Sequence, residues 1–326
     1  MKLTFALPAL NWSDPQQLPP LNTPTLHQFC RFGRFTPQAS TPTDFMARYL
    51  WQGSLRAHAL TSLGLPAHTP AIFASPLWQQ MGMHQMATLS GADIGISTGE
   101  AETLCGGLNE FYAAEGWQVY PYRADLWLIT LAHTPDWQAA PVLDILGQVD
   151  GTMRAEGAAE REWLRWQTEI QMWLHAHPLN QARQSRQAPP INGVWLWQDA
   201  CGQQTDALFI ASNSVWANSH CSDAPFDWQA WQTLLSEQTS VVDNAVLLLD
   251  DLCTARHTAN VWAYHDTVQQ WESRFFAPAW QALKNGQIQQ LNLLTDGVHG
   301  GCLQLHRTSH WAFWRTQRPF KGLFSV

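Results

Sequence analysis

The sequence predicts an α/β fold with a mostly parallel sheet at its core. After Pro189 the chain alternates short apolar runs with amphipathic segments, which is typical of parallel strands joined by helical crossovers. Its 326 residues suffice for one large domain or two smaller ones. Apolar residues make up 45% and charged residues only 13%, whereas a disordered chain has the opposite composition.

The first elements are a strand, a loop and a helix. Residues 2–7 form an apolar run that predicts the first strand, and a proline-rich loop follows over 8–24. The apolar positions of residues 26–32 have helical spacing, and Gly33 is a typical helix end. The segment 36–42 is rich in Pro, Ser and Thr, which predicts a linker and a domain boundary.

The middle of the chain predicts a capped helix followed by a hairpin. Ser97 and Glu100 have the Ser-x-x-Glu spacing of a capping box, in which each side chain binds the other residue's backbone N–H. We expect this helix to run to about Gly116. Residues 118–120 and 126–131 are strand-like runs on either side of a turn, which predicts a hairpin.

Tryptophan is unusually frequent, with 19 residues. In residues 158–175 the indoles form a stripe at helical spacing, and Pro178 is expected to end that helix. Trp195 and Trp197 alternate along a predicted strand, so we expect them on one face and buried. The alternative for these indoles is a surface on which a ligand stacks.

The remaining strands and helices predict the domain organisation. Further strands are expected at 194–197, 208–211, 245–249 and 291–295, with helices at 226–235 and 263–283. Strand 2–7 cannot bury both of its faces alone and needs these later strands as neighbours. We therefore expect residues 1–45 and 188–326 to form the core, and residues 46–187 to form an inserted α+β domain.

Charge and composition exclude several classes of partner. The chain has 18 Lys and Arg against 26 Asp and Glu, a net charge of −8, so we expect no nucleic acid partner. No apolar run approaches the roughly 20 residues of a membrane helix, so we expect no membrane partner. The six widely spaced cysteines and an N-terminus without a signal-peptide pattern predict a reduced, cytoplasmic protein.

Acidic and histidine residues follow two predicted strands. In open α/β sheets, ligands bind beyond the carboxyl ends of the strands. Carboxylate and imidazole suit Zn²⁺ and Mn²⁺, which predicts a divalent or dinuclear metal site. The alternative is that the acids cap the following loops and the histidines are solvated. The candidate metal ligands are Asp250, Asp251, His257, Asp296, His299 and His306.

A second cluster of polar residues lies at the end of the tryptophan-rich helix and just after it. His175, His177, Asn180 and Arg183 predict an anion or phosphate site, because an arginine fork matches phosphate oxygens. The alternative is a helix end whose Asn and His side chains bind unsatisfied backbone groups. The sequence contains no GxxxxGK[ST], GxGxxG, GxSxG or HExxH motif.

Two stretches carry a family resemblance. His-Pro-Leu-Asn-Gln-Ala-Arg at 177–183 and Pro-Pro-Ile-Asn-Gly-Val-Trp-Leu-Trp at 189–197 resemble a conserved stretch of archaeal-type cofactor-independent phosphoglycerate mutases. Residues 22–27, residues 245–257, Asp296 and His306 resemble further mutase segments. The whole chain is similar to the RpfE-type regulatory proteins, a phosphoglycerate-mutase-like group. The resemblance implies an alkaline-phosphatase-like fold with a second domain inserted into the metal-binding one.

Departures from the mutase pattern decide the expected function. Mutases of this family end their first strand in a metal-binding Asp-Gly, whereas residues 7–10 contain no ligand, and their Asp-His pair is Asp296-Gly297 here. Thr23 is the one candidate phosphoryl acceptor. Loss of a ligand from a two-metal clamp removes charge that stabilises the reacting oxygens.

We therefore expect a cytoplasmic, catalytically decayed protein, a pseudoenzyme with a regulatory role. It would bind a small phosphorylated or anionic ligand or a protein partner. Mn²⁺ or Zn²⁺ would be its cofactor if the metal site is intact. One alternative is an active metal-dependent phosphomutase or phosphohydrolase that uses the acid and histidine set. The other is a protein-interaction scaffold with a Trp-rich surface.

Overall fold

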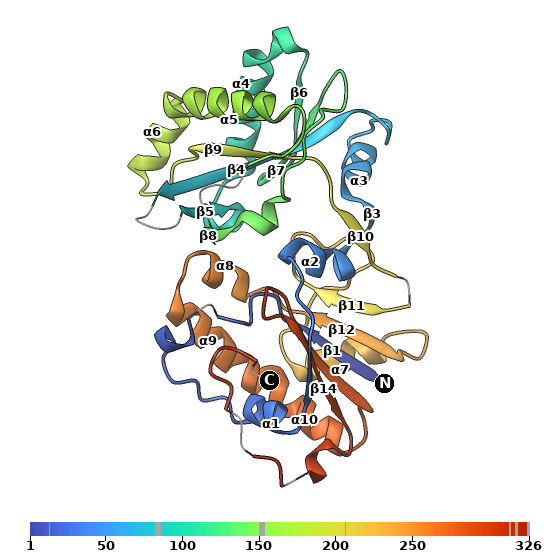
Figure 1. The fold of residues 1–326 in the computed structure, drawn as a ribbon. Coiled ribbons are helices and arrows are strands. Elements are labelled where there is room, and N and C mark those ends of the chain that lie inside the picture. Colours follow the sequence, from blue (N-terminus) through green and yellow to red (C-terminus); the bar gives the residue numbers. More distant parts are fainter. Residues whose placement is uncertain are drawn as a thin grey trace. The chain divides into compact units, whose positions relative to one another are not determined.

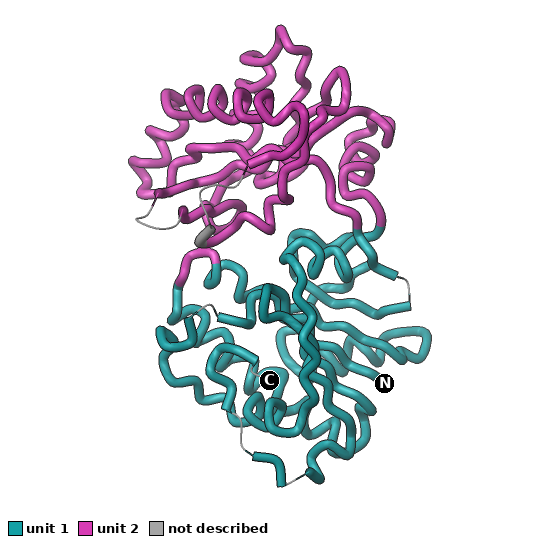
Figure 2. Tube along the Cα trace, viewed as in Figure 1, with its two compact units in different colours: residues 1–52, 202–256, 260–326 teal, residues 53–201, 257–259 magenta. Residues whose placement is uncertain are grey.

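The chain folds into two compact units (Figure 2). The computed structural model describes residues 1–12, 14–81, 86–149, 154–205, 207–312, 314–316 and 319–324. Unit 1 comprises residues 1–52, 202–256 and 260–326, and unit 2 comprises residues 53–201 and 257–259. The chain therefore enters unit 2 after residue 52 and leaves it after residue 201, both later than the expected boundaries at 45 and 187.

Unit 1 is built on a six-stranded sheet in the order β11-β12-β1-β13-β14-β2 (Figure 1). The strands are β1 (Lys2–Ala6), β2 (Arg34–Pro37), β11 (Phe209–Ser212), β12 (Asn244–Leu248), β13 (Gln290–Thr295) and β14 (Gly301–His306). β11, β12, β1 and β13 are parallel. β14 pairs antiparallel with β13, and edge strand β2 pairs antiparallel with β14, so β2 runs in the same direction as the four parallel strands. β1 lies between β12 and β13, with Lys2 opposite Asn244 and Gln290. The predicted α/β class with a mostly parallel core is confirmed, as is the need of the first strand for later neighbours.

Helices cover this sheet and bring aromatic side chains onto it. The helices of unit 1 are α1 (Pro24–Phe32), α2 (Pro42–Leu50), α7 (Trp228–Ser236), α8 (Leu252–His257), α9 (Val261–Trp271), α10 (Ala277–Lys284) and the short 3-10 turns η1 (Pro15–Gln17) and η6 (Ser309–Trp311). Of these, α1, α7, α8, α9 and α10 contribute side chains to the buried core of the sheet. Phe276 lies 5.6 Å from Phe5 of β1 and 5.9 Å from Phe29 of α1, measured between ring centroids. These rings form part of one buried core that ties α1 and the α9–α10 segment to the sheet.

Two expected features of unit 1 are corrected by the structure. The segment 36–42, expected as a linker, begins inside edge strand β2 and continues into α2. Pro37 fits there because an edge strand tolerates a residue without a backbone N–H. The helix expected over 263–283 is interrupted by a π-helical turn, η5 (Glu272–Phe276), before α10. Pro278 explains the interruption, because its missing N–H leaves the preceding turn without an α-helical bond.

Unit 2 contains an antiparallel sheet in the order β6-β7-β4-β5-β8, and β9 also pairs with β4. The strands are β4 (Ala71–Met81), β5 (Met86–Ser90), β6 (Gln118–Arg123), β7 (Leu126–Thr130), β8 (Gly147–Val149) and β9 (Gly193–Trp197). The helices are α3 (Leu55–Ser62), α4 (Thr98–Phe111), α5 (Glu160–His175), α6 (Pro178–Ser185) and the turns η2 (Gly91–Asp93), η3 (Ala113–Glu115) and η4 (Val142–Ile145). The two short strands β3 (Gln52–Ser54) and β10 (Cys201–Gln203) pair where the chain passes between units. The predicted hairpin and capping box are both present.

The strand predicted at residues 194–197 was expected in the parallel core, and that expectation is wrong. β9 pairs antiparallel with β4, with Trp197 opposite Phe73. A short apolar run indicates a buried strand but does not specify its partner. This pairing explains why unit 2 extends to residue 201.

The expectation that Trp195 and Trp197 are buried is confirmed. They are 4% and 1% exposed. The indole N–H of Trp195 donates to the carbonyl of Ala140, and that of Trp197 donates to the hydroxyl of Ser75. Each indole thus buries its ring and satisfies its one donor.

Among the described residues, no helix has the length and apolar character to cross a bilayer.

Candidate functional site

The carboxyl ends of β1, β12 and β13 meet at one edge of the unit 1 sheet. The N–H of Leu7 donates to the carbonyl of Leu294 at 2.8 Å, and the N–H of Leu249 donates to the carbonyl of Ala6 at 3.0 Å. Asp250 lies two residues after the end of β12, and Asp296 directly follows β13. The acids predicted from the sequence therefore flank the loop that follows β1, at the edge where such sheets bind ligands.

Asp296 closes the loop after β1. Its carboxylate Oδ1 accepts the backbone N–H of Ala9 at 2.7 Å, and Asp296 is 8% exposed. Ala9 has a φ of 62°, in the left-handed region that an alanine adopts at a cost of roughly 1–2 kcal/mol. A second bond, from Asn11 Nδ2 to the carbonyl of His299 at 2.7 Å, joins the same two loops. These contacts hold a strained turn against the acid at the end of β13.

Arg256 provides a positive charge beside Asp296. Burial lowers the pKa of Arg256 from its ordinary value, and the electrostatic attraction of Asp296 opposes that shift. The guanidinium carbon lies 5.8 Å from the ring centroid of Trp12. Asp296 thus has both a backbone donor and a cation supplied by this chain. No local pattern in the sequence indicates this arrangement, because Arg256 lies within α8 and Asp296 lies 40 positions later.

Asp250 is half-buried and its neighbour Asp251 is exposed. Burial raises the pKa of the Asp250 carboxyl above its ordinary value. A hydrogen bond from the Ser214 hydroxyl acts in the opposite direction, and the charge of Asp251 adds to the rise. Asp250 therefore holds its charge less readily than a solvated aspartate.

The other candidate metal ligands lie apart from this edge. His306 ends β14 opposite Gln290, whereas Gly301 starts β14 opposite Thr295. Five strand steps of about 3.4 Å place His306 roughly 17 Å from the carboxyl edge. The expectation that His306 follows Asp296 into one site is therefore wrong, because the antiparallel strand carries the histidine to the other end of the sheet.

The two remaining histidines have separate surroundings. His299 is exposed in the β13–β14 loop. His257 is grouped with unit 2, where its Nδ1 lies 2.7 Å from Oδ2 of Asp93. Within the described ranges, His, Cys, Asp and Glu form no group of three or more placed to hold a metal ion. The residues present thus do not fit a two-metal clamp as the sequence predicted it.

Thr23 is fully buried at the start of α1. Its hydroxyl has no hydrogen-bond partner among the described residues and does not cap the helix. The N–H groups of Thr25 and Leu26 instead donate to the carboxylate of Glu272, at 2.6 and 3.2 Å. Glu272 is the helix cap that sequence reasoning missed, because it comes from the π-helical turn far along the chain.

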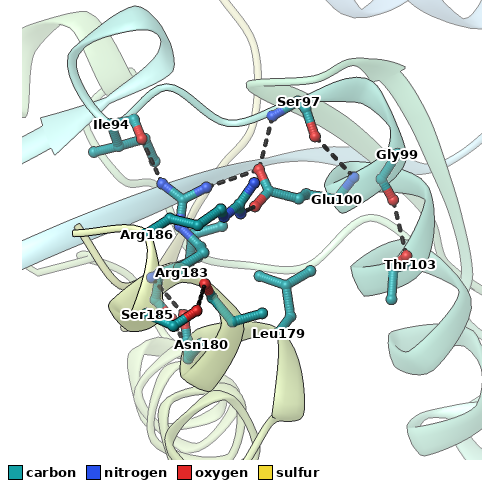
Figure 3. A network of polar contacts seen from close by, with 12 residues as sticks. Ile94, Ser97, Gly99, Glu100, Thr103, Leu179, Asn180, Arg183, Ser185 and Arg186 are labelled. Atoms are coloured by element: carbon teal, nitrogen blue, oxygen red, sulfur yellow. Dashed lines mark hydrogen bonds and ion pairs between the residues drawn. The ribbon is translucent and has the colours of Figure 1, made fainter. Parts of the chain in front are cut away.

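The predicted anion-site arginine lies in a buried network in unit 2 (Figure 3). Arg183 is fully buried, and its Nε donates to the carbonyl of Pro189 at 2.8 Å. Its Nη1 donates to Oε2 of Glu100 at 2.7 Å, and its Nη2 donates to the carbonyl of Ile94. Arg186 donates to the other oxygen of Glu100 at 2.6 Å. The arginine fork thus binds the protein itself rather than facing solvent.

Glu100 joins this network to the capping box of α4. Burial raises the pKa of its carboxyl, but hydrogen bonds from the Ser97 N–H, Arg183 and Arg186 outweigh it and leave the pKa below its ordinary value. Glu100 therefore stays ionised at neutral pH between two guanidinium groups. The network as a whole carries one net positive charge.

The other residues of the predicted anion site surround the start of α6. Asn180 is buried: its Nδ2 donates to the carbonyls of Leu174 and Ile191, and its Oδ1 accepts the N–H of Ile191. His177 is half-buried and accepts the N–H of Leu179 at 3.2 Å, and burial lowers its pKa. His175 is exposed. The alternative noted for this segment, a helix end that satisfies backbone groups, describes Asn180 and His177.

A shallow groove of about 720 Å³ runs beside this helix start. Its lining combines His177 and Arg186 with Glu100, Thr103 and apolar residues of α6. The volume lies in the range of small-molecule sites. This groove is the solvent-accessible part of the predicted anion site.

No protein-family model matches the sequence, and no curated protein matches it either. The solved structures that are similar to this chain include the following two. A cofactor-independent phosphoglycerate mutase from Thermoplasma acidophilum DSM 1728 gives a TM-score of 0.41 at 14% identity, covering 94% of this chain and 90% of the other. The PH0037 protein from Pyrococcus horikoshii gives a TM-score of 0.47 at 11% identity, covering 94% of this chain and 87% of the other. At these identities the likeness concerns the fold alone.

Proposed function

We propose that this chain has a phosphoglycerate-mutase-like fold, does not catalyse metal-dependent phosphoryl transfer, and acts by binding. The observation that supports this is the state of Asp296, whose carboxylate accepts the Ala9 N–H and has Arg256 as its cationic neighbour. A two-metal mechanism requires carboxylates that hold ions against the attacking and leaving oxygens. Here an ion would share the carboxylate with the Ala9 N–H and compete with the guanidinium of Arg256.

The surroundings of Thr23 support the same proposal. A nucleophile must reach its substrate and have a base within hydrogen-bond distance. Thr23 has no exposed surface, and its hydroxyl has no partner among the described residues. The N-terminus of α1, which would stabilise a transferred phosphoryl group, already binds the carboxylate of Glu272.

The proposed binding role is regulatory, with a small phosphorylated or anionic ligand in the groove beside His177. Arg186 lines this groove and its side chain is 59% exposed, so it retains donors that a ligand can reach. Arg183 then acts as the support of the groove through Glu100, and contacts no ligand itself.

The test uses the full chain. Mn²⁺ is titrated by calorimetry, and interconversion of 2- and 3-phosphoglycerate and phosphate release are assayed with and without Mn²⁺. We expect no stoichiometric tight binding and no turnover above buffer. Turnover that Asp296→Asn abolishes would establish the alternative, an active metal-dependent phosphomutase or phosphohydrolase. In a separate titration with 3-phosphoglycerate, Arg186→Ala should weaken binding and the exposed Arg161→Ala should not. No binding to wild type would remove the small-anion role while leaving the first result intact.

A further inference from the structure

The positive charges of this acidic chain are unevenly distributed. Residues 24–37 and 277–326 contain seven of its 18 Lys and Arg residues but only one of its 26 acids, Asp296. The rest of the sequence is correspondingly more acidic than the net charge of −8 suggests. A local basic surface is therefore compatible with a negative whole-chain charge, because charges beyond about 8–10 Å are screened at physiological salt.

The topology of unit 1 gathers these cations at one edge of the sheet. Lys284 ends α10, Arg34 starts β2 opposite Gln304, and Arg307 directly follows β14. A Cβ on Gly286, just after α10, would come within 2.9 Å of the guanidinium carbon of Arg307. These residues lie at the amino ends of the parallel strands, whereas Asp296 lies at the opposite, carboxyl ends.

Two buried aromatic rings, Phe32 and Trp280, are contacted by cations from different elements. Phe32 stacks on Trp280 at 5.9 Å between centroids, and His310 lies 6.2 Å from the same indole. Lys284 Nζ lies 5.8 Å from the Trp280 centroid, and the Arg31 guanidinium lies 5.0 Å from that of Phe32. α1 and α10, which carry these rings, lie side by side in Figure 1.

The C-terminal segment adds two exposed indoles. Trp311 is 65% exposed and Trp314 is 73% exposed, three residues apart. Nη1 of Arg315 donates to the carbonyls of Phe32 and Gly33, at 2.8 and 3.1 Å, and Nε of Arg31 donates to the carbonyl of Arg315. These bonds fix the segment against the end of α1. We call the surface formed by Arg34, Lys284, Arg307, Trp311, Trp314 and Arg315 the basic aromatic patch.

We propose that the basic aromatic patch binds the surface of an anionic lipid membrane. Indoles place their apolar rings and their N–H at the level of the lipid headgroups, and Lys and Arg are attracted to anionic headgroups. Two exposed indoles so close in sequence suit shallow insertion, and the four surrounding cations supply the charge. Attachment at a membrane surface requires no helix that spans the bilayer, and the expectation of no membrane partner rested on the absence of such a helix.

The experiment measures sedimentation of the full chain with vesicles. One vesicle is phosphatidylcholine alone, and the other is an equal mixture of phosphatidylcholine and phosphatidylglycerol. We expect binding to the mixed vesicle only, a blue shift of tryptophan emission, and loss of binding at high salt. Arg34→Glu with Arg307→Glu should lower the partition coefficient by about tenfold or more, since each lost cation weakens attachment about fivefold. Trp311→Ala with Trp314→Ala should lower it and abolish the blue shift.

Matched controls change the same residue types elsewhere. Arg161→Glu and Trp262→Ala alter an exposed arginine of unit 2 and an indole that is 64% exposed, and both should bind like wild type. Equal binding to the neutral vesicle, or full binding by both double variants, would overturn the proposal. So would tighter binding to single-stranded DNA or to a polyglutamate peptide, which would assign the patch to a nucleic acid or an acidic protein. Displacement by inorganic phosphate at constant ionic strength would assign it to a free anion. If the arginine variant does not fold, the tryptophan variant decides the outcome.

Discussion

Arg183 is the residue whose removal best distinguishes a structural network from a ligand site. Arg183→Ala leaves the carbonyls of Ile94 and Pro189 without their donor, and leaves Glu100 with one guanidinium instead of two. About 1 kcal/mol for each carbonyl and about 2 kcal/mol for the charged bond give a loss of about 4 kcal/mol. That agrees with the roughly 3–5 kcal/mol for breaking a buried ion pair.

The matched control is Arg186→Ala, which removes the other guanidinium on the same carboxylate. Because the Arg186 side chain is 59% exposed and that of Arg183 is 1% exposed, its loss should cost about 0.5 kcal/mol. Urea denaturation followed by tryptophan fluorescence measures both variants at pH 7. Equal losses of unfolding free energy in the two variants would contradict this prediction, because the predicted difference depends on the burial of the two side chains and not on their charge.

The stability difference between wild type and Arg183→Ala should depend on pH. The pKa of Glu100 is lowered in the folded chain, so its contribution to stability is present above the unfolded glutamate pKa of about 4.3 and is lost as the pH falls through the lowered folded value. The difference between wild type and Arg183→Ala should shrink below about pH 4 toward the roughly 2 kcal/mol of the two carbonyls. A difference that stays constant from pH 7 to pH 3 would show that Glu100 takes no part.

Two further variants test the cores of the two units. Trp197→Ala should lose about 3–5 kcal/mol in urea denaturation, because the indole is 1% exposed and lies 4.6 Å from the ring of Phe73, whereas Trp262→Ala should change stability by less than about 0.5 kcal/mol. A Trp197→Ala protein that melts like wild type would contradict the packing interpretation. Glu272→Ala should lose about 2–4 kcal/mol, since two N–H groups at the start of α1 lose their acceptor, and Glu272→Gln should lose less. Equal losses for the two Glu272 variants would show that the side chain acts by packing and not by capping.

Local patterns in the sequence were enough to predict the elements whose contacts are local. The capping box at Ser97 and Glu100 spans three residues, and both of its bonds are present. The hairpin at β6–β7 and the tryptophan stripe of α5 also depend on spacings within one turn or one strand. The burial of Trp195 and Trp197 was predicted from alternation along a single strand and is confirmed, although the intervening Leu196 is buried as well. Such patterns are determined by backbone geometry over a few residues.

The candidate site depended on partners that are distant in sequence. Arg183 meets Glu100 across 83 positions, Glu272 reaches Thr25 across 247, and Asp296 holds Ala9 across 287. The sequence supplied the residue types of the site but not their partners. Arg183 therefore suggested a guanidinium that binds phosphate, and Thr23 suggested a phosphoryl acceptor. The tertiary structure decided otherwise, because a buried donor or acceptor binds whatever complementary group the fold brings within about 3 Å. For the same reason only the sheet register could show that His306 and Asp296 lie at opposite ends of the β13–β14 pair.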